Sequence, residues 1–100
     1  MSRTYYTDYV RHALRFYARN NVHRPLFKSE VDKNNWLSCE CILKKYPVEI
    51  REILIEIYAG HDTLADEVYI ACKKRNIEQN NIWDTMKIVE QKIAHRRGLL

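Results

Sequence analysis

The sequence predicts an all-α protein, folded as a single-domain bundle of about five helices. Three observations support this. The chain has 100 residues, the size of one domain. Its apolar content of 46% can supply a core, and no apolar run approaches the length that spans a membrane. Two glycines and two prolines leave few turns for a sheet, and apolar residues recur at helical spacing.

Segment 1–28 is expected to form a basic, aromatic helix followed by a linker. The helix TYYTDYVRHALRFYAR places one apolar face at Tyr6, Tyr9 or Val10, Ala13 and Tyr17. Aromatic rings interleaved with arginines can stack on bases and bind phosphates. More often such rings are core contacts edged by arginines, and we favour that interpretation.

The linker NNVHRPLFK separates this helix from the next, because its proline keeps the preceding residue out of the helical region. Leu26 and Phe27 are expected to pack against the core. Ser29 and Asp32 resemble a capping box, with Asp in the place of Glu, and predict the start of a second helix. Its body is KNNWLSCECILKKY.

A third helix, PVEIREILIEIYAG, begins at Pro47, a residue suited to a first helical turn. It has the clearest amphipathic pattern of the chain, formed by Ile50, Ile53, Leu54, Ile57 and Tyr58. Gly60 is expected to end this helix, and Asp62 or Thr63 to cap the next one.

Residues 62–94 predict two further helices joined by a turn. The first carries small or apolar residues at helical spacing, namely Leu64, Ala65, Val68, Ala71 and Cys72. The second carries one stripe, formed by Ile82, Met86, Val89 and Ile93. Asn76 tolerates the left-handed conformation that ends a helix, and Ile77 is expected to be buried after it. The spacing of Cys72, Asn76, Ile77 and Ile82 fits a helix-turn-helix, with a plain helical hairpin as the alternative.

The outward face of the second of these helices is rich in groups that can read DNA. It begins with Glu78 and continues with Gln79, Asn80, Asn81, Asp84 and Lys87. Asn and Gln can pair with adenine in the major groove, and Lys can reach guanine or phosphate. Three consecutive amides are also common at a solvated helix start.

Positive charge is unevenly distributed along the chain, whose net charge is +4. Residues 1–28 hold six Lys and Arg against one acid, whereas residues 29–60 hold four against six. The basic segment favours a polyanion partner, with ordinary solubility as the alternative. The last helix ends at Gly98, where His95, Arg96 and Arg97 can interact with the helix dipole as well as with phosphate.

Metal binding and catalysis are not expected. The three cysteines and four histidines lack the spacing of a zinc site. An odd number of cysteines favours reduced, buried thiols over disulfides. Nucleophile elbows and phosphate-cradling glycine loops are missing from the sequence, so we expect no cofactor and no enzyme activity. The first residues, MSRTYYTDYV, lack the apolar segment of a secretory signal, which predicts a cytoplasmic protein without a membrane partner.

From Pro47 onward the chain resembles region four of bacterial sigma factors and the related phage late-transcription activators. The resemblance covers residues 47–97, about half the chain, and rests on three parts in order. These parts are PVEIREILIEIYAG, DTLADEVYIACKKRNI and EQNNIWDTMKIVEQKIAHRRGL.

This resemblance implies a DNA-binding transcription regulator of phage or mobile-element type, with double-stranded DNA as its partner. The residues implied to face bases are Asn80, Asn81, Asp84 and Lys87. Those implied to approach the DNA backbone are Lys73, Lys74, Arg75 and Gln79, with His95, Arg96 and Arg97 as a second phosphate-binding group.

The alternative function is a non-enzymatic protein-interaction module that forms a homodimer or docks on a larger complex such as RNA polymerase. Its support is the tyrosine-rich first helix, the modest net charge, and two apolar residues that stand off the core stripes, Ile55 and Trp83.

Overall fold

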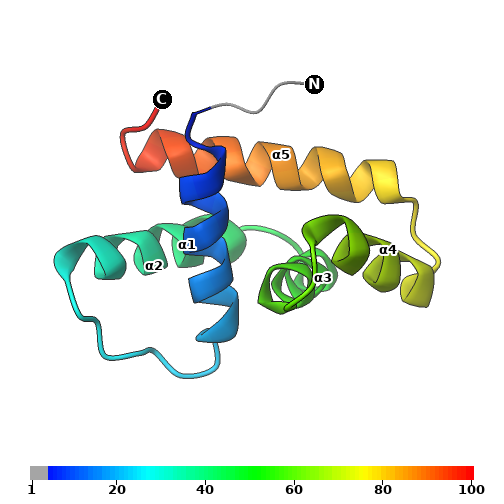
Figure 1. Ribbon diagram of the computed structural model, residues 1–100, viewed down its shortest axis with the longest axis horizontal. Coiled ribbons are helices and arrows are strands. Elements are labelled where there is room, and N and C mark those ends of the chain that lie inside the picture. Colours follow the sequence, from blue (N-terminus) through cyan, green and yellow to red (C-terminus); the bar gives the residue numbers. More distant parts are fainter. Residues whose placement is uncertain (1–4) are drawn as a thin grey trace.

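The computed structural model describes residues 5–100, which form five α-helices and no strand (Figure 1). The all-α prediction is confirmed. The helices are α1 (Thr7–Arg19), α2 (Glu30–Leu43), α3 (Val48–Ala59), α4 (Leu64–Arg75) and α5 (Gln79–Arg96). Thr4, where the first helix was expected to begin, lies outside the described residues. Within residues 5–100, no helix has the length and apolar character needed to cross a membrane.

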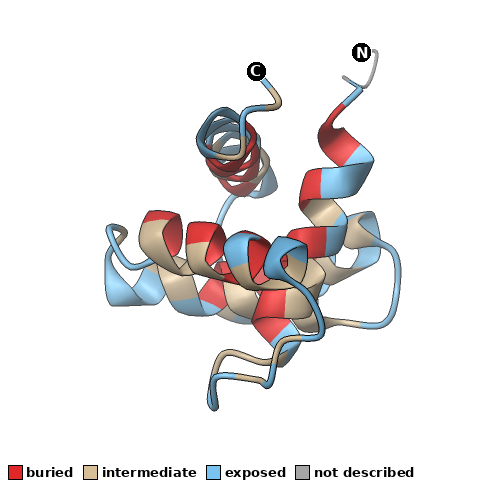
Figure 2. Ribbon diagram, turned by 90° about the vertical axis from the view of Figure 1, so that its left-hand side faces the viewer, coloured by how far each residue is buried: buried red, intermediate tan, exposed pale blue. Residues whose placement is uncertain are grey.

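Two helices organise the bundle. α1 packs against α2, α3 and α5, and α5 packs against α1, α2 and α4. In the view of Figure 1, α5 lies along the upper edge of the molecule and α3 is seen end-on below it. Figure 2 shows that buried residues lie on the side of α5 that faces the other helices, and exposed residues on its outer side.

α1 begins at Thr7 and buries the face that its spacing predicts. Of the two alternatives for one core position, Val10 is fully buried and Tyr9 is 42% exposed. The remaining predicted members of this face, Tyr6, Ala13 and Tyr17, are buried. The aromatic face of α1 therefore belongs mainly to the core.

The start of α2 is capped as predicted, because Ser29 Oγ accepts a hydrogen bond from the Asp32 backbone N–H at 3.1 Å. Phe27 packs edge-on against Trp36, with ring centroids 6.0 Å apart. The prediction for Leu26 is wrong, since its side chain is 99% exposed. Adjacent side chains of an extended segment point to opposite sides, so only one of this pair can face the core.

α3 buries the stripe that its pattern predicts, although Ile50 is only half-buried. Pro47 occupies the position just before the helix, and Gly60 the position just after it. Gly60 has an extended conformation, with φ −63° and ψ 158°. The chain therefore leaves α3 in an extended conformation and not through a left-handed turn.

Candidate nucleic-acid interface

The turn between α4 and α5 has the geometry that the sequence predicts. Thr63 caps the start of α4, where its Oγ1 accepts a hydrogen bond from the Asp66 backbone N–H at 3.2 Å. At the other end Asn76 is left-handed, with φ 55° and ψ 48°. The Ile77 N–H donates to the Cys72 carbonyl at 2.9 Å, and the Asn76 N–H donates to the Lys73 carbonyl at 3.3 Å. This pair of bonds is the Schellman motif, which stops α4 and redirects the chain.

The expected burial of Ile77 is wrong, because its side chain is 37% exposed. Its backbone bond to Cys72 holds it beside the last turn of α4. Ile82, on the first turns of α5, is 2% exposed and is the apolar residue that re-enters the core after the turn.

α5 presents the predicted amides and cations to solvent while its stripe is buried. Ile82, Met86, Val89 and Ile93 are each at most 2% exposed. On α5, the exposed residues that the sequence assigned to DNA are Gln79, Asn80, Asn81, Asp84, Lys87, His95 and Arg96. The structure therefore brings seven of the predicted residues onto one solvent-facing helix.

A buried hydrogen-bonded ion pair fixes the orientation of α5 about its own axis. The Glu90 side chain is 6% exposed, and Arg11 Nε of α1 donates to its Oε2 at 2.9 Å. Tyr58 Oη of α3 donates to the same oxygen at 2.6 Å. Burial, followed by the charge of Glu90, raises the pKa of Tyr58 well above its usual value, so the phenol stays protonated and remains a donor. Because Glu90 is buried against α1 and α3, these bonds resist rotation of α5 and keep its exposed residues facing outward.

Two of the predicted α4 cations are engaged within the protein. Arg75 Nη2 lies 2.9 Å from Glu56 Oε1 of α3, and its Nη1 donates to the Ala71 carbonyl at 3.3 Å. Lys74 Nζ also lies 3.2 Å from the Glu56 carboxylate, although its side chain is 60% exposed. The hydrogen bond from Arg75 is the main cause that lowers the pKa of Glu56. Arg75 therefore ties α4 to α3, whereas Lys73 and Lys74 keep exposed side chains.

Arg97 is the third predicted DNA contact that the fold uses internally. Its Nε donates to Asn35 Oδ1 of α2 at 2.7 Å. Just after it the chain ends α5 with a second Schellman motif, in which Gly98 has φ 75° and the Leu99 N–H donates to the Ala94 carbonyl at 2.8 Å. Arg97 thus anchors the end of α5 against α2.

Sequence reasoning missed Gln91 and Lys92, which are exposed residues on the same helix. Gln91 lies seven positions after Asp84 and four after Lys87, so helical geometry places it on their side. The helical periodicity of the sequence could have identified Gln91, because Asp84 and Lys87 had already been assigned to the exposed face.

The arginines of α1 serve as internal contacts. Arg15 Nη1 donates to the carbonyls of Tyr58 and Gly60 at 3.3 and 2.6 Å. Arg19 donates to the carbonyls of Ala59 and Gly60 at 3.2 and 2.9 Å. Together they satisfy acceptors at the C-terminal end of α3, where cations are favourable.

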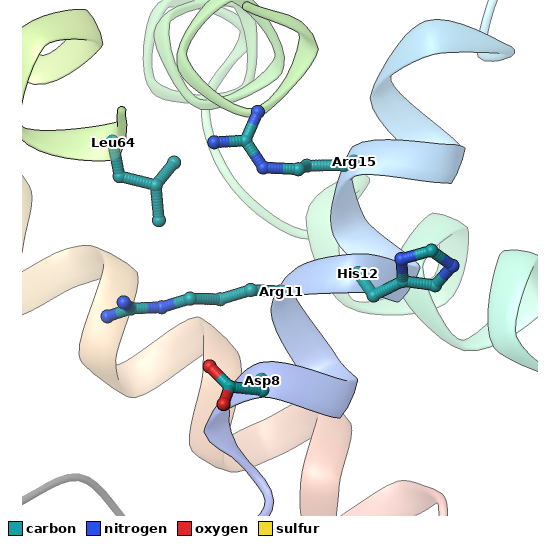
Figure 3. Close-up of a pocket in the computed structure, with 5 residues that line it drawn as sticks. All are labelled: Asp8, Arg11, His12, Arg15 and Leu64. Carbon is teal, nitrogen blue, oxygen red and sulfur yellow. The ribbon is translucent and has the colours of Figure 1, made fainter. Parts of the chain in front are cut away.

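A cavity of about 380 Å³ opens beside these arginines (Figure 3). Arg11 and Arg15 extend along it toward Leu64, whereas His12 points away. Arg11 binds Glu90 and Arg15 binds the end of α3, so both of these lining cations are engaged within the protein.

In the part of the chain that the structure describes, no three His, Cys, Asp or Glu side chains are close enough to hold a metal ion. The three cysteines are free, and burial raises the pKa of Cys39 to about 12. Comparisons with protein-family models, with curated proteins and with solved structures found no match.

Proposed function

We propose that the protein binds double-stranded DNA by placing α5 in the major groove, and that it regulates transcription in a phage or mobile element. The observation that carries this proposal is the free outer face of α5. That helix has 18 residues, and its exposed face is about 27 Å long at the usual rise per residue. The major groove of DNA admits an α-helix, and the buried Glu90 contacts hold this one in a single orientation.

The side chains on that face suit the edges of bases. Asn80, Asn81 and Gln91 can each donate to and accept from adenine, and Asp84 can accept from the amino group of cytosine. Lys87 can reach guanine. Each well-formed contact of this kind discriminates against the wrong base by about 1–3 kcal/mol.

Phosphate contacts come from cations around this face. Lys92 and Arg96 lie on α5, and Lys73 and Lys74 lie on the last turns of α4, just before the turn. Every phosphate that a cation neutralises steepens the fall of log K with log salt by about 0.9. The resemblance of residues 47–97 to sigma region four adds support for a transcriptional role.

The test is selection of preferred sites from a random duplex pool, followed by fluorescence anisotropy at several salt concentrations. The wild type should enrich one site, and its affinity should fall as salt rises. The Asn81→Ala/Lys87→Ala variant should lose the preference for that site while its circular dichroism is unchanged. The matched control, Lys28→Ala/Asn34→Ala, removes the same two kinds of exposed side chain from elsewhere and should keep the preference. Unaltered site preference in the first variant contradicts the proposal.

The second candidate function is an interaction module, favoured by Tyr5 and Tyr9, which are 81% and 42% exposed. Its other structural support is weaker, because Ile55 and Trp83 are partly buried and pack against the protein's own core. Analytical ultracentrifugation separates the two functions. A dimer whose sedimentation coefficient does not change when random-sequence duplex DNA is added at low salt favours the interaction module. A monomer that co-sediments with the DNA favours DNA binding.

A further inference from the structure

We propose that a groove between α2 and the C-terminal half of α5 binds an acidic amphipathic helix of a partner protein. The groove has a volume of about 590 Å³. Its apolar lining comes from Ile42, Ile88 and Leu100. Gln91, Lys92 and Arg96 belong both to this lining and to the face proposed to contact DNA, so the partner helix and DNA would compete for this half of α5.

Two of the apolar side chains of the groove are exposed and are not needed to complete the hydrophobic core. Ile88 is 47% exposed and Leu100 is 58% exposed, whereas Ile42 is 8% exposed beneath them. The buried stripe of α5 is complete without Ile88, which projects on the solvent side of the helix. DNA phosphates and base edges would gain little from these aliphatic groups, whereas apolar side chains of a protein helix would bury them.

The rim of the groove is basic. Two of the lining side chains, Lys92 and Arg96, are cationic, His95 adds an imidazole, and none of the lining side chains is acidic. Lys92 is also held in place, because its Nζ lies 3.3 Å from Tyr46 Oη and 5.1 Å from the centre of that ring. A pre-positioned cation beside an apolar floor complements a helix that carries Asp and Glu next to its apolar residues.

This arrangement assigns a different role to two residues that the sequence placed on phosphate. His95 and Arg96 line the groove together with the aliphatic side chains, where Arg96 would pair with a carboxylate of the partner helix and His95 could hydrogen-bond to it. The first turns of α5, which carry Asn80, Asn81 and Asp84, stay outside the groove lining. The first turns of α5 would thus contact DNA alone, whereas its C-terminal half would bind either DNA or the partner helix.

The test titrates the full chain with a fluorescein-labelled amphipathic peptide that has leucines on one face and Glu and Asp beside them. The expected result is saturable binding that weakens with salt, with amide shifts concentrated at Ile42, Ile88 and residues 91–100. Ile88→Gln should lower the affinity about threefold to tenfold, because half of an isoleucine side chain loses its burial. Ile70→Gln is the matched control, since Ile70 is 49% exposed on α4 and should leave the affinity unchanged.

The charge complementarity is tested separately. Lys92→Gln/Arg96→Gln should weaken binding of the acidic peptide, and a peptide with lysines in place of the acids should not bind. The proposal is overturned by no saturable binding up to about 1 mM, by equal affinity of Ile88→Gln and Ile70→Gln, or by equal binding of the lysine peptide. It is also overturned if random-sequence duplex DNA, and not the acidic peptide, shifts the Ile88 and Leu100 methyl signals.

Discussion

Glycine and alanine at position 76 should have opposite effects on stability. Asn76 has φ 55° and ψ 48°, a conformation that costs an ordinary L-residue about 1–2 kcal/mol and costs glycine almost nothing. Asn tolerates it better than Ala. We therefore expect Asn76→Ala to lower the free energy of unfolding by about 1 kcal/mol, and Asn76→Gly to leave it equal or raise it slightly. In a domain of this size a loss of 1 kcal/mol lowers the Tm by roughly 4–8 °C.

The assay is urea unfolding followed by circular dichroism, with the same pair of substitutions at Asn34 as the control. Asn34 is exposed inside α2, where glycine is less favourable than alanine by about 1 kcal/mol. The order of the two variants should therefore reverse between the sites, with glycine better at 76 and alanine better at 34. An Asn76→Ala protein that is more stable than Asn76→Gly would refute the left-handed turn, and with it the separation of α4 from α5.

Two further predictions concern the contacts that hold α5 and α4 in place. Tyr58→Phe removes one of the two donors to the buried Glu90 carboxylate. The free energy of unfolding, measured in urea, should fall by about 1.5–3 kcal/mol. A loss below about 0.5 kcal/mol would contradict the role of the Tyr58 hydroxyl in holding Glu90. Arg75 lowers the pKa of Glu56, so this carboxylate stabilises the fold above its unfolded pKa, and that contribution disappears as the pH falls through the lowered folded value. Glu56→Gln should therefore have a lower Tm than the wild type at neutral pH. Its Tm should also fall less than that of the wild type when the pH is lowered. An equal fall of Tm in both proteins would contradict the ion pairs of Glu56 with Arg75 and Lys74.

Structural features that depend only on residues close together in the sequence could be predicted. The caps at Ser29 and Thr63, the turn at Asn76 and the apolar stripe of α5 each depend on residues within a few positions of one another. The exposed amides of α5 followed from the same periodicity, because knowing the buried stripe fixes the opposite face.

The destinations of the long polar side chains could not be predicted. Arg15 reaches carbonyls more than 40 residues away, and Arg75 reaches a carboxylate 19 residues away. Such contacts depend on how the helices cross, which local pattern does not specify. For the same reason the sequence could not show that Ile77 and Leu26 face solvent, since only the packed bundle decides which apolar residue fills a given space.

Arg15 and Arg19 bind the carbonyls at the end of α3, so α1 is an integral part of the bundle and not a separate basic segment. If a partner pulled α1 away, the Gly60 carbonyl would lose both of its guanidinium donors at once, and Glu90 would lose Arg11. The helix proposed to read DNA would then be held at that carboxylate by Tyr58 alone. Displacement of α1 would thus loosen the contacts that orient α5, although most of the chain separates the two helices in sequence.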